Sequence, residues 1–213
     1  MNSKPFLIGL TGASGSGKTT FLQQLEAAFE PEQLLIISQD NYYRPREQQK
    51  IDENGVANFD LPDAIHLNEF AEDIARLLRY ETVERQEYTF NNPNVVPRQL
   101  LFQPRPIIIV EGLFVMYDKT MSELLDLKVF LHAPETTAFS RRIRRDQIER
   151  NYPLEDVLYR YEKHVIPTYE KYIRPLHQQA DLVINNYQQF DRGLAVLIGF
   201  LKDKIKPQQP ANG

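Results

Sequence analysis

The sequence contains no cysteine, and this absence excludes several kinds of chemistry at once. A disulfide framework, a thiolate zinc site and a cysteine nucleophile are all ruled out. Long apolar runs are missing too. The longest are Phe6–Leu10, Ile107–Val110 and Leu194–Leu201, far short of the ~18 to 20 residues that a membrane span requires. We therefore expect a soluble, cytoplasmic protein with no membrane partner.

A surplus of basic residues is also lacking. The chain has 25 lysines and arginines against 29 aspartates and glutamates, which gives a net charge of −4. Proteins that coat nucleic acid normally carry a basic surplus, so we expect no nucleic-acid partner. A length of 213 residues suits one domain with room for a small insert or lid.

Short β-type runs alternate with stretches of helical periodicity. Several of these runs are apolar without alternation, which is typical of strands that are covered on both faces in a parallel sheet. The runs are Phe6–Leu10, Leu34–Ser38, Pro106–Val110, Leu127–His132 and Asp181–Ile184. Two apolar stripes of helical spacing lie between them, Phe21, Leu22, Leu25 and Phe29, then Ile65, Phe70, Ile74, Leu77 and Leu78. The order predicts an α/β fold, a doubly wound and mainly parallel five-stranded sheet flanked by helices.

Two segments interrupt this alternation. Residues 81–106 are polar and rich in proline, and we expect a hairpin-like insert that contacts the substrate. Residues 134–179, which we call the lid, are charged and helical in pattern, with expected breaks near Asn151–Pro153 and at Pro167. We expect a single domain over residues 1–206 and a disordered tail over residues 207–213.

The most specific local signal is a glycine-rich phosphate loop. It lies between a predicted strand and a predicted helix, which is the context that the G-x-x-x-x-G-K-[ST] motif requires. Glycines let backbone N–H groups surround a phosphate, and the positive end of the helix faces the same anion. The lysine can reach the β- and γ-phosphates, and the threonine can bind Mg²⁺. The residues expected to bind ATP are Gly12, Ala13, Ser14, Gly15, Ser16, Gly17, Lys18, Thr19 and Thr20.

The loop alone does not distinguish a kinase from a GTPase or a motor ATPase. A GTPase needs a guanine-reading Asn/Thr-Lys-x-Asp run, and no lysine of this chain lies in one. Asp52–Gly55 matches D-x-x-G, but it falls in a polar loop and not at a strand end. These features favour a small-molecule kinase of the P-loop fold.

Two carboxylates end apolar strands. The ends of parallel strands face the crevice where the phosphate loop opens, so Glu111 is expected to hold Mg²⁺ and Asp40 to lie beside the acceptor alcohol. Asp40 would orient the hydroxyl and take its proton late in the reaction. The alternatives are an exposed strand-end carboxylate for Glu111 and a turn-forming aspartate for Asp40.

An arginine cluster lies within the lid although the chain is acidic overall. Such a run is usually a solvated helix face, but closure of the lid over ATP would bring one or two guanidinium groups to the transferring phosphoryl group. The cluster comprises Arg141, Arg142, Arg144, Arg145 and Arg150.

Several motifs together give the chain a family resemblance. They are the phosphate loop, Ser38-Gln39-Asp40-Asn41-Tyr42-Tyr43, Asn58-Phe59-Asp60-Leu61-Pro62-Asp63-Ala64, Val110-Glu111-Gly112, Ser140–Asp146 and Glu149-Arg150. In order and spacing the chain resembles the uridine kinase family over residues 6–186. The resemblance implies ATP- and Mg²⁺-dependent phosphorylation of the 5′-hydroxyl of a pyrimidine ribonucleoside, uridine or cytidine, usually by a homotetramer.

The resemblance also implies roles for individual residues. By position, Asp40 is the base, Asp60 binds ribose hydroxyls, and Thr19 and Glu111 bind magnesium. The basic residues that match catalytic, lid or substrate positions are Lys18, Arg142, Arg145 and Arg150. The aromatic residues that match the nucleoside pocket are Tyr43, Tyr88 and Phe90, for which core packing is the alternative.

Two positions depart from the family pattern. Pro93 occupies the place of a base-reading histidine, and proline has no N–H to donate. Arg160 occupies the place of a glutamine that faces the base. The acceptor could therefore be a different sugar or an anionic alcohol, which Arg160 would suit. A nucleotide-binding regulatory protein with little phosphotransfer is the alternative from another class.

Overall fold

The computed structural model describes residues 4–89, 95–148 and 152–206. None of the helices in these ranges is both long and apolar enough to cross a membrane. The expected disordered tail, residues 207–213, lies outside the described residues.

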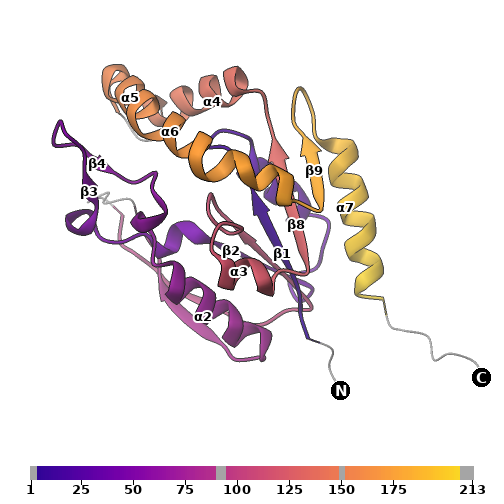
Figure 1. Ribbon diagram of the computed structural model, residues 1–213. Helices are drawn as coiled ribbons and strands as arrows, with labels where there is room; N and C mark the ends of the chain where they lie inside the picture. Colours follow the sequence, from indigo (N-terminus) through magenta and orange to yellow (C-terminus); the bar gives the residue numbers. More distant parts are fainter. Residues whose placement is uncertain (1–3, 90–94, 149–151, 207–213) are drawn as a thin grey trace, which may run out of the picture.

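A five-stranded parallel sheet forms the centre of the molecule (Figure 1). Its strand order is β2-β7-β1-β8-β9. The strands are β1 (Phe6–Thr11), β2 (Leu34–Ser38), β7 (Ile107–Glu111), β8 (Leu127–His132) and β9 (Leu182–Asn185). The predicted α/β fold with a five-stranded parallel sheet is confirmed, because each apolar run forms a strand that pairs in parallel with its neighbours.

The strand register aligns the polar ends of the strands. Leu10 of β1 and Ser38 of β2 both lie opposite Glu111, the last residue of β7. The phosphate loop begins directly after β1, at Gly12. Glu111, Ser38 and the phosphate loop therefore share one edge of the sheet, where open α/β sheets bind their ligands.

Two separate apolar cores cover the two faces of the sheet. Alternate residues of each strand point to opposite faces, so Leu7 belongs to one core and Ile8 to the other. The first core includes α2 (Leu67–Leu78) and α3 (Lys119–Leu124), and the second includes α1 (Lys18–Glu26) and α7 (Asp191–Lys204). Of the two predicted stripes, Phe29 and Ile65 lie just outside their helices, and the remaining residues are buried in these cores.

Two short hairpins project from the domain. β5 (Val83–Gln86) and β6 (Gln99–Phe102) pair antiparallel, in agreement with the hairpin expected over residues 81–106. β3 (Lys50–Ile51) and β4 (Ala57–Asn58) form a second hairpin that the sequence did not predict. Three 3₁₀ turns lie in the connecting segments, η1 (Gln39–Tyr42), η2 (Arg46–Gln48) and η3 (Pro62–Ala64).

The lid lies across the carboxyl ends of the strands (Figure 1). It begins with α4 (Glu135–Ile148). The chain becomes helical again in α5 (Leu154–Arg160), after non-helical Tyr152 and Pro153. The rest of the lid consists of η4 (Tyr161–Val165), α6 (Ile166–Thr168), η5 (Tyr169–Ile173) and η6 (Arg174–Gln179).

The predicted break at Pro167 is wrong. The helix continues through this proline, because π-helical turns, η4 and η5, lie on both sides of it. In η4 the N–H of Ile166 donates to the carbonyl of Tyr161, five residues earlier. This wider turn accommodates a residue that has no N–H and whose ring would crowd a regular helix.

Candidate active site

The phosphate loop is held in a shape that only glycine permits. Gly15 has φ +82° and Gly17 has φ +99°, a region that residues with a Cβ rarely adopt. A Cβ on Gly15 would lie 2.2 Å from the carbonyl oxygen of Ala138 in α4. The loop therefore touches the backbone of the lid directly, and a change in one displaces the other.

Lys18 lies among the loop carbonyls at the start of α1. Its Nζ donates to the carbonyl oxygens of Gly12 (2.9 Å) and Ala13 (3.2 Å). Burial lowers the pKa of Lys18, while the negative charges of Glu111 and Asp40 oppose that shift. The ammonium thus faces both carboxylates that the sequence singled out.

Ser38 connects the Glu111 carboxylate to the backbone of Asp40. Its hydroxyl donates to Glu111 Oε1 (2.6 Å) and accepts from the backbone N–H of Asp40 (3.2 Å). Burial and then the charge of Asp40 raise the pKa of Glu111, and the charge of Lys18 and the Ser38 hydrogen bond partly offset them. Asp40, Glu111 and Lys18 therefore lie close enough at the sheet edge for their charges to influence one another's protonation.

The donors at this edge suit magnesium. Thr19 is exposed on the first turn of α1, and Glu111 and Asp40 are half-buried. A divalent cation binds well to oxygen ligands, and it relieves the repulsion between two neighbouring carboxylates. Within the described residues, no group of three or more His, Cys, Asp and Glu side chains could hold a metal. A magnesium ion here would take its remaining ligands from phosphate and water.

Ion pairs hold two of the lid arginines, Arg142 and Arg145. Arg142 donates from Nη1 to Asp60 Oδ1 (3.1 Å), and only 9% of the Arg142 side chain and 13% of the Asp60 side chain are exposed. Asp146 pairs with Arg142 (3.2 Å) and with Arg145 (2.9 Å). Burial lowers the pKa of Arg142, but the charges of Asp60 and Asp146 raise it above its ordinary value, so the guanidinium stays charged.

The aromatic residues gather beside Asp40. The ring centroids of Tyr43 and Tyr88 lie 5.4 Å apart, and those of Tyr43 and Phe59 lie 6.1 Å apart. Tyr88 donates its backbone N–H to Asn41 Oδ1 (3.2 Å), next to Asp40 in η1. Tyr43 also packs against the first core, so packing accounts for part of its surface. Phe90, the third aromatic residue expected here, lies outside the described residues.

Arg160 points at the β3–β4 hairpin. Its Nη1 donates to the carbonyl oxygen of Ala57 (2.9 Å), and its guanidinium lies 5.9 Å from the ring centre of Tyr152. Pro93, the other departure from the family pattern, and Arg150 lie outside the described residues.

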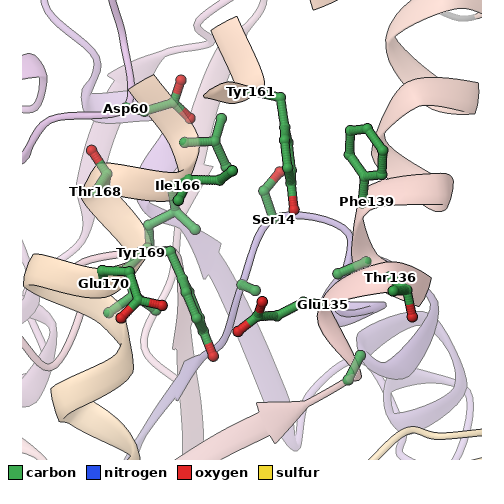
Figure 2. A pocket seen from close by; sticks show the side chains of 16 residues that line it. Ser14, Asp60, Glu135, Thr136, Phe139, Tyr161, Ile166, Thr168, Tyr169 and Glu170 are labelled. Atoms are coloured by element: carbon green, nitrogen blue, oxygen red, sulfur yellow. The ribbon is translucent and has the colours of Figure 1, made fainter. Parts of the chain in front are cut away.

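A cavity of about 250 Å³ lies beside the contact between the phosphate loop and the lid, and residues of both line it. Figure 2 shows Tyr161, Tyr169 and Phe139 around the cavity with Ser14 of the phosphate loop, and the ring centroids of Phe139 and Tyr161 lie 4.2 Å apart. Asp60 lies at one end of the cavity (Figure 2). The described lining residues include three acids, Asp60, Glu135 and Glu170, and no lysine, arginine or histidine. Asp40 and Glu111 do not line it, so the cavity adjoins the sheet-edge acids without containing them.

Sequence reasoning missed three residues that shape this edge. Ser38 orients Glu111, and the buried Gln39 accepts the N–H of Phe114 at Oε1 (2.9 Å). Asn186 donates to the carbonyl of Ser16 in the phosphate loop (2.8 Å). Only their positions in the sequence could have indicated these three residues, because each is polar and ends or directly follows an apolar strand.

Comparison with known proteins places the chain in a family of kinases. The chain matches the family described as Phosphoribulokinase / Uridine kinase over residues 7–191. It is 34% identical over 200 residues to a uridine kinase of Borrelia duttonii, covering 94% of this chain and 96% of that protein.

Two solved structures resemble its fold. One is a putative fructose transport system kinase from Silicibacter, with TM-score 0.65, 18% identity and coverage of 85% of this chain and 90% of that one. The other is a possible uridine kinase from Bacillus stearothermophilus, with TM-score 0.58, 18% identity and coverage of 86% and 90%.

Proposed function

This chain belongs to the phosphoribulokinase and uridine kinase family of P-loop kinases, and on that premise we propose that it phosphorylates the 5′-hydroxyl of uridine or cytidine with ATP. The observation that carries the proposal is the group formed by Lys18, Asp40 and Glu111 beside the phosphate loop. A protein that only senses nucleotide has no need of a carboxylate placed for an acceptor alcohol.

Asp40 acts on the acceptor hydroxyl. Its carboxylate is a far weaker base than an alkoxide, so it cannot ionise the alcohol in advance. It orients the O–H by a hydrogen bond and takes the proton as the oxygen bonds to the γ-phosphorus. The bond from that phosphorus to the β–γ bridging oxygen breaks, and ADP leaves with its electron pair.

The positive groups stabilise charge on the phosphates. Lys18 and the N–H groups of the phosphate loop bind the donor. Thr19 and Glu111 would hold Mg²⁺, which when bound neutralises charge on the β- and γ-phosphates. Arg142 and Arg145 provide guanidinium groups beside Lys18, since the charges of both lower the pKa of that lysine.

Several observations support a neutral acceptor. Asp60 offers Oδ2 to ribose hydroxyls while Arg142 holds Oδ1. The neighbouring cavity has aromatic walls and acidic residues, a poor environment for an anion. Arg160 is engaged with Ala57, which weakens the anionic-alcohol alternative. Full-length similarity to a uridine kinase at 34% identity points to pyrimidine nucleosides. The fold neighbours, at 18% identity, carry no weight on the acceptor.

An acceptor panel tests the proposal. The protein is incubated with Mg-ATP and, separately, uridine, cytidine, adenosine, fructose and glycerate, and both ADP and the phosphorylated product are measured. We expect UMP and CMP as products and little turnover with glycerate. Faster turnover of glycerate or fructose would overturn the nucleoside assignment, and acceptor-independent ADP release alone would favour the regulatory alternative. The implied homotetramer stays a prediction, which light scattering checks.

A further inference from the structure

The β3–β4 hairpin leaves the domain through a narrow neck. Gln49 closes this neck, since its buried side-chain Nε2 donates to the carbonyl oxygens of Arg44 (2.8 Å) and Ala64 (3.2 Å). Residues 50–60 project from this point and return to it. The neck therefore provides two fixed ends about which the segment can pivot.

The far end of the hairpin is bound to the lid. The carboxylate of Asp52 accepts hydrogen bonds from Tyr159 Oη (2.8 Å) and His164 Nε2 (2.7 Å). Asn54 Nδ2 donates to the same tyrosine oxygen (2.8 Å). His164 is only 1% exposed, so its contact with the hairpin is shielded from water. Hydrogen bonds to a charged acceptor in such a place are among the stronger ones in proteins.

A second contact lies nearer to the active site. Arg160 donates to the carbonyl of Ala57 in β4 (2.9 Å). A little further along the chain, the N–H of Asp60 donates to Asn58 Oδ1 (2.9 Å), which fixes Asp60 relative to the hairpin. Arg142 then holds the Asp60 carboxylate from α4.

The hairpin segment contacts the rest of the domain through an ion pair and a ring contact, whereas it contacts the lid through hydrogen bonds. In the described part of the chain, residues 50–60 also contact the domain through the Lys50–Asp63 ion pair at the neck and the Phe59–Tyr43 ring contact (6.1 Å). The lid makes the hydrogen bonds through Arg142, Tyr159, Arg160 and His164 described above. The segment is thus attached to the domain at its neck and to the lid along its length.

We propose that residues 50–60 move as one body with the lid, and that Tyr159, Arg160 and His164 are positioning residues that place Asp60 for the acceptor. The inference rests on the proposed function, in which Asp60 binds acceptor hydroxyls. Lid closure over ATP then completes the acceptor site by carrying Asp60 into position. Arg160 occupies the place of a base-reading residue in the family pattern, and here it holds the hairpin to the lid through the carbonyl of Ala57.

Hydrogen exchange tests the coupling without any acceptor, so its result does not depend on the acceptor assignment. The probe is a non-hydrolysable ATP analogue with Mg²⁺. In the unmodified protein we expect the analogue to slow exchange in peptides from the hairpin and from α5–η4 together, by about tenfold in each, as a shift in a two-state equilibrium would give.

Two variants break the attachment from opposite sides. Tyr159→Phe removes the lid hydroxyl, and Asp52→Ala removes the hairpin carboxylate. In both, the analogue should still slow exchange in the lid, but the slowing in the hairpin should be smaller, most of all in Asp52→Ala, which loses the bonds to both Tyr159 and His164. Glu162→Gln is the matched control, because this exposed lid residue pairs with Lys163 and not with the hairpin. Hairpin protection that is undiminished in both variants, or that is absent in the unmodified protein, would overturn the proposal.

Steady-state kinetics separate positioning from general destabilisation. With uridine and Mg-ATP, Tyr159→Phe should raise the KM for uridine about tenfold, while kcat and the KM for ATP stay within about twofold. A purely structural role would lower the melting temperature and affect both substrates alike. Equal effects on both KM values would therefore contradict the assignment even if the hairpin peptides behaved as expected.

Discussion

Asp40 owes its position to its neighbours in the chain. Ser38 binds its backbone N–H, and the adjacent Gln39 fixes the same turn to the loop after β7 through Phe114. A carboxylate on a backbone this constrained can meet an acceptor hydroxyl without first being ordered, which is the condition for efficient proton transfer.

Replacing this carboxylate tests its proposed role as base. We expect Asp40→Asn to lower kcat by on the order of 10² or more, because the amide cannot accept the proton. Binding of a fluorescent ATP analogue should be nearly unchanged. The comparison variant is Asp203→Asn, which alters an exposed carboxylate of α7. Unchanged turnover in Asp40→Asn would remove Asp40 from the reaction.

At the residue scale, the sequence predicted the strand-end acids but not their connections. Asp40 and Glu111 could be selected because a charge that follows an apolar strand is rarely tolerated without a function. The Ser38 hydrogen bond depends on the register of β2 against β7, and the sequence of either strand alone does not encode it. Arg160 was expected to face the acceptor, and its contact with Ala57 follows from a hairpin too short to recognise in the sequence.

Among the elements, the phosphate loop and α4 meet at Gly15, and two glycines allow a matched test. Gly15 and Gly55 both have positive φ, +82° and +78°, so alanine costs either position about 1 to 2 kcal/mol of backbone strain. A Cβ on Gly55 would meet no atom within 4 Å, whereas one on Gly15 would meet the Ala138 carbonyl oxygen at 2.2 Å.

We therefore expect different functional outcomes from the two substitutions. Gly15→Ala should lower kcat by on the order of 10², because the lid can no longer approach the loop. Gly55→Ala should lower the melting temperature modestly and leave kcat unchanged. The measurements are thermal unfolding and turnover of both variants, and equal turnover would show that the contact with the lid is dispensable.

The hairpin element makes a prediction about pH. Desolvation raises the pKa of Asp52, but the hydrogen bonds from Val56, Tyr159, His164 and Asn54 outweigh it and hold this pKa well below the ordinary 3.8. A depressed pKa contributes stability that is complete above the unfolded value and is lost as pH falls through the folded one.

Asp52→Asn mimics the protonated form at every pH. The difference in urea midpoint between the unmodified protein and Asp52→Asn should be greatest and constant from neutral pH to about pH 5. It should shrink as the pH falls below 3.8, toward the lower pKa of the folded state. A difference that grows in acid would contradict the assigned hydrogen bonds.

How far the elements were predictable depended on how strongly apolar residues marked them. The five strands could be identified because parallel strands are buried on both faces and read as continuous apolar runs. β3 could not, since Lys50 and Ile51 are both exposed. A proline predicts a break only in a regular α-helix, and the π-helical turns η4 and η5 on either side of Pro167 make this helix irregular.

At the scale of the whole molecule, nucleotide binding should stabilise the fold. The phosphate loop contacts α4 through Gly15 and the segment after β9 through Asn186, so a ligand in the loop strengthens contacts among distant parts of the chain. A non-hydrolysable ATP analogue at 100 times its Kd should add about 2.7 kcal/mol, which raises the melting temperature by about 5 to 10 °C.

Lys18→Ala should abolish most of this thermal shift at the same analogue concentration, because it removes the ammonium that we propose binds the β- and γ-phosphates. The control is Lys119→Ala, which changes an exposed lysine on α3. A full shift in Lys18→Ala would mean that the analogue binds elsewhere.

The two cores on opposite faces of the sheet have a consequence for how such a protein can diversify. Helix α1, which follows the phosphate loop, packs with α7 in one core. Tyr42 of η1, α2 and the β5–β6 hairpin, on the side where we propose that the acceptor binds, pack in the other. Mutations that reshape the acceptor side therefore leave the packing beneath the ATP site intact. A kinase of this fold could therefore change its acceptor alcohol through substitutions in one core alone. A chimera that takes that core from a relative should phosphorylate the relative's acceptor and still use ATP as phosphate donor.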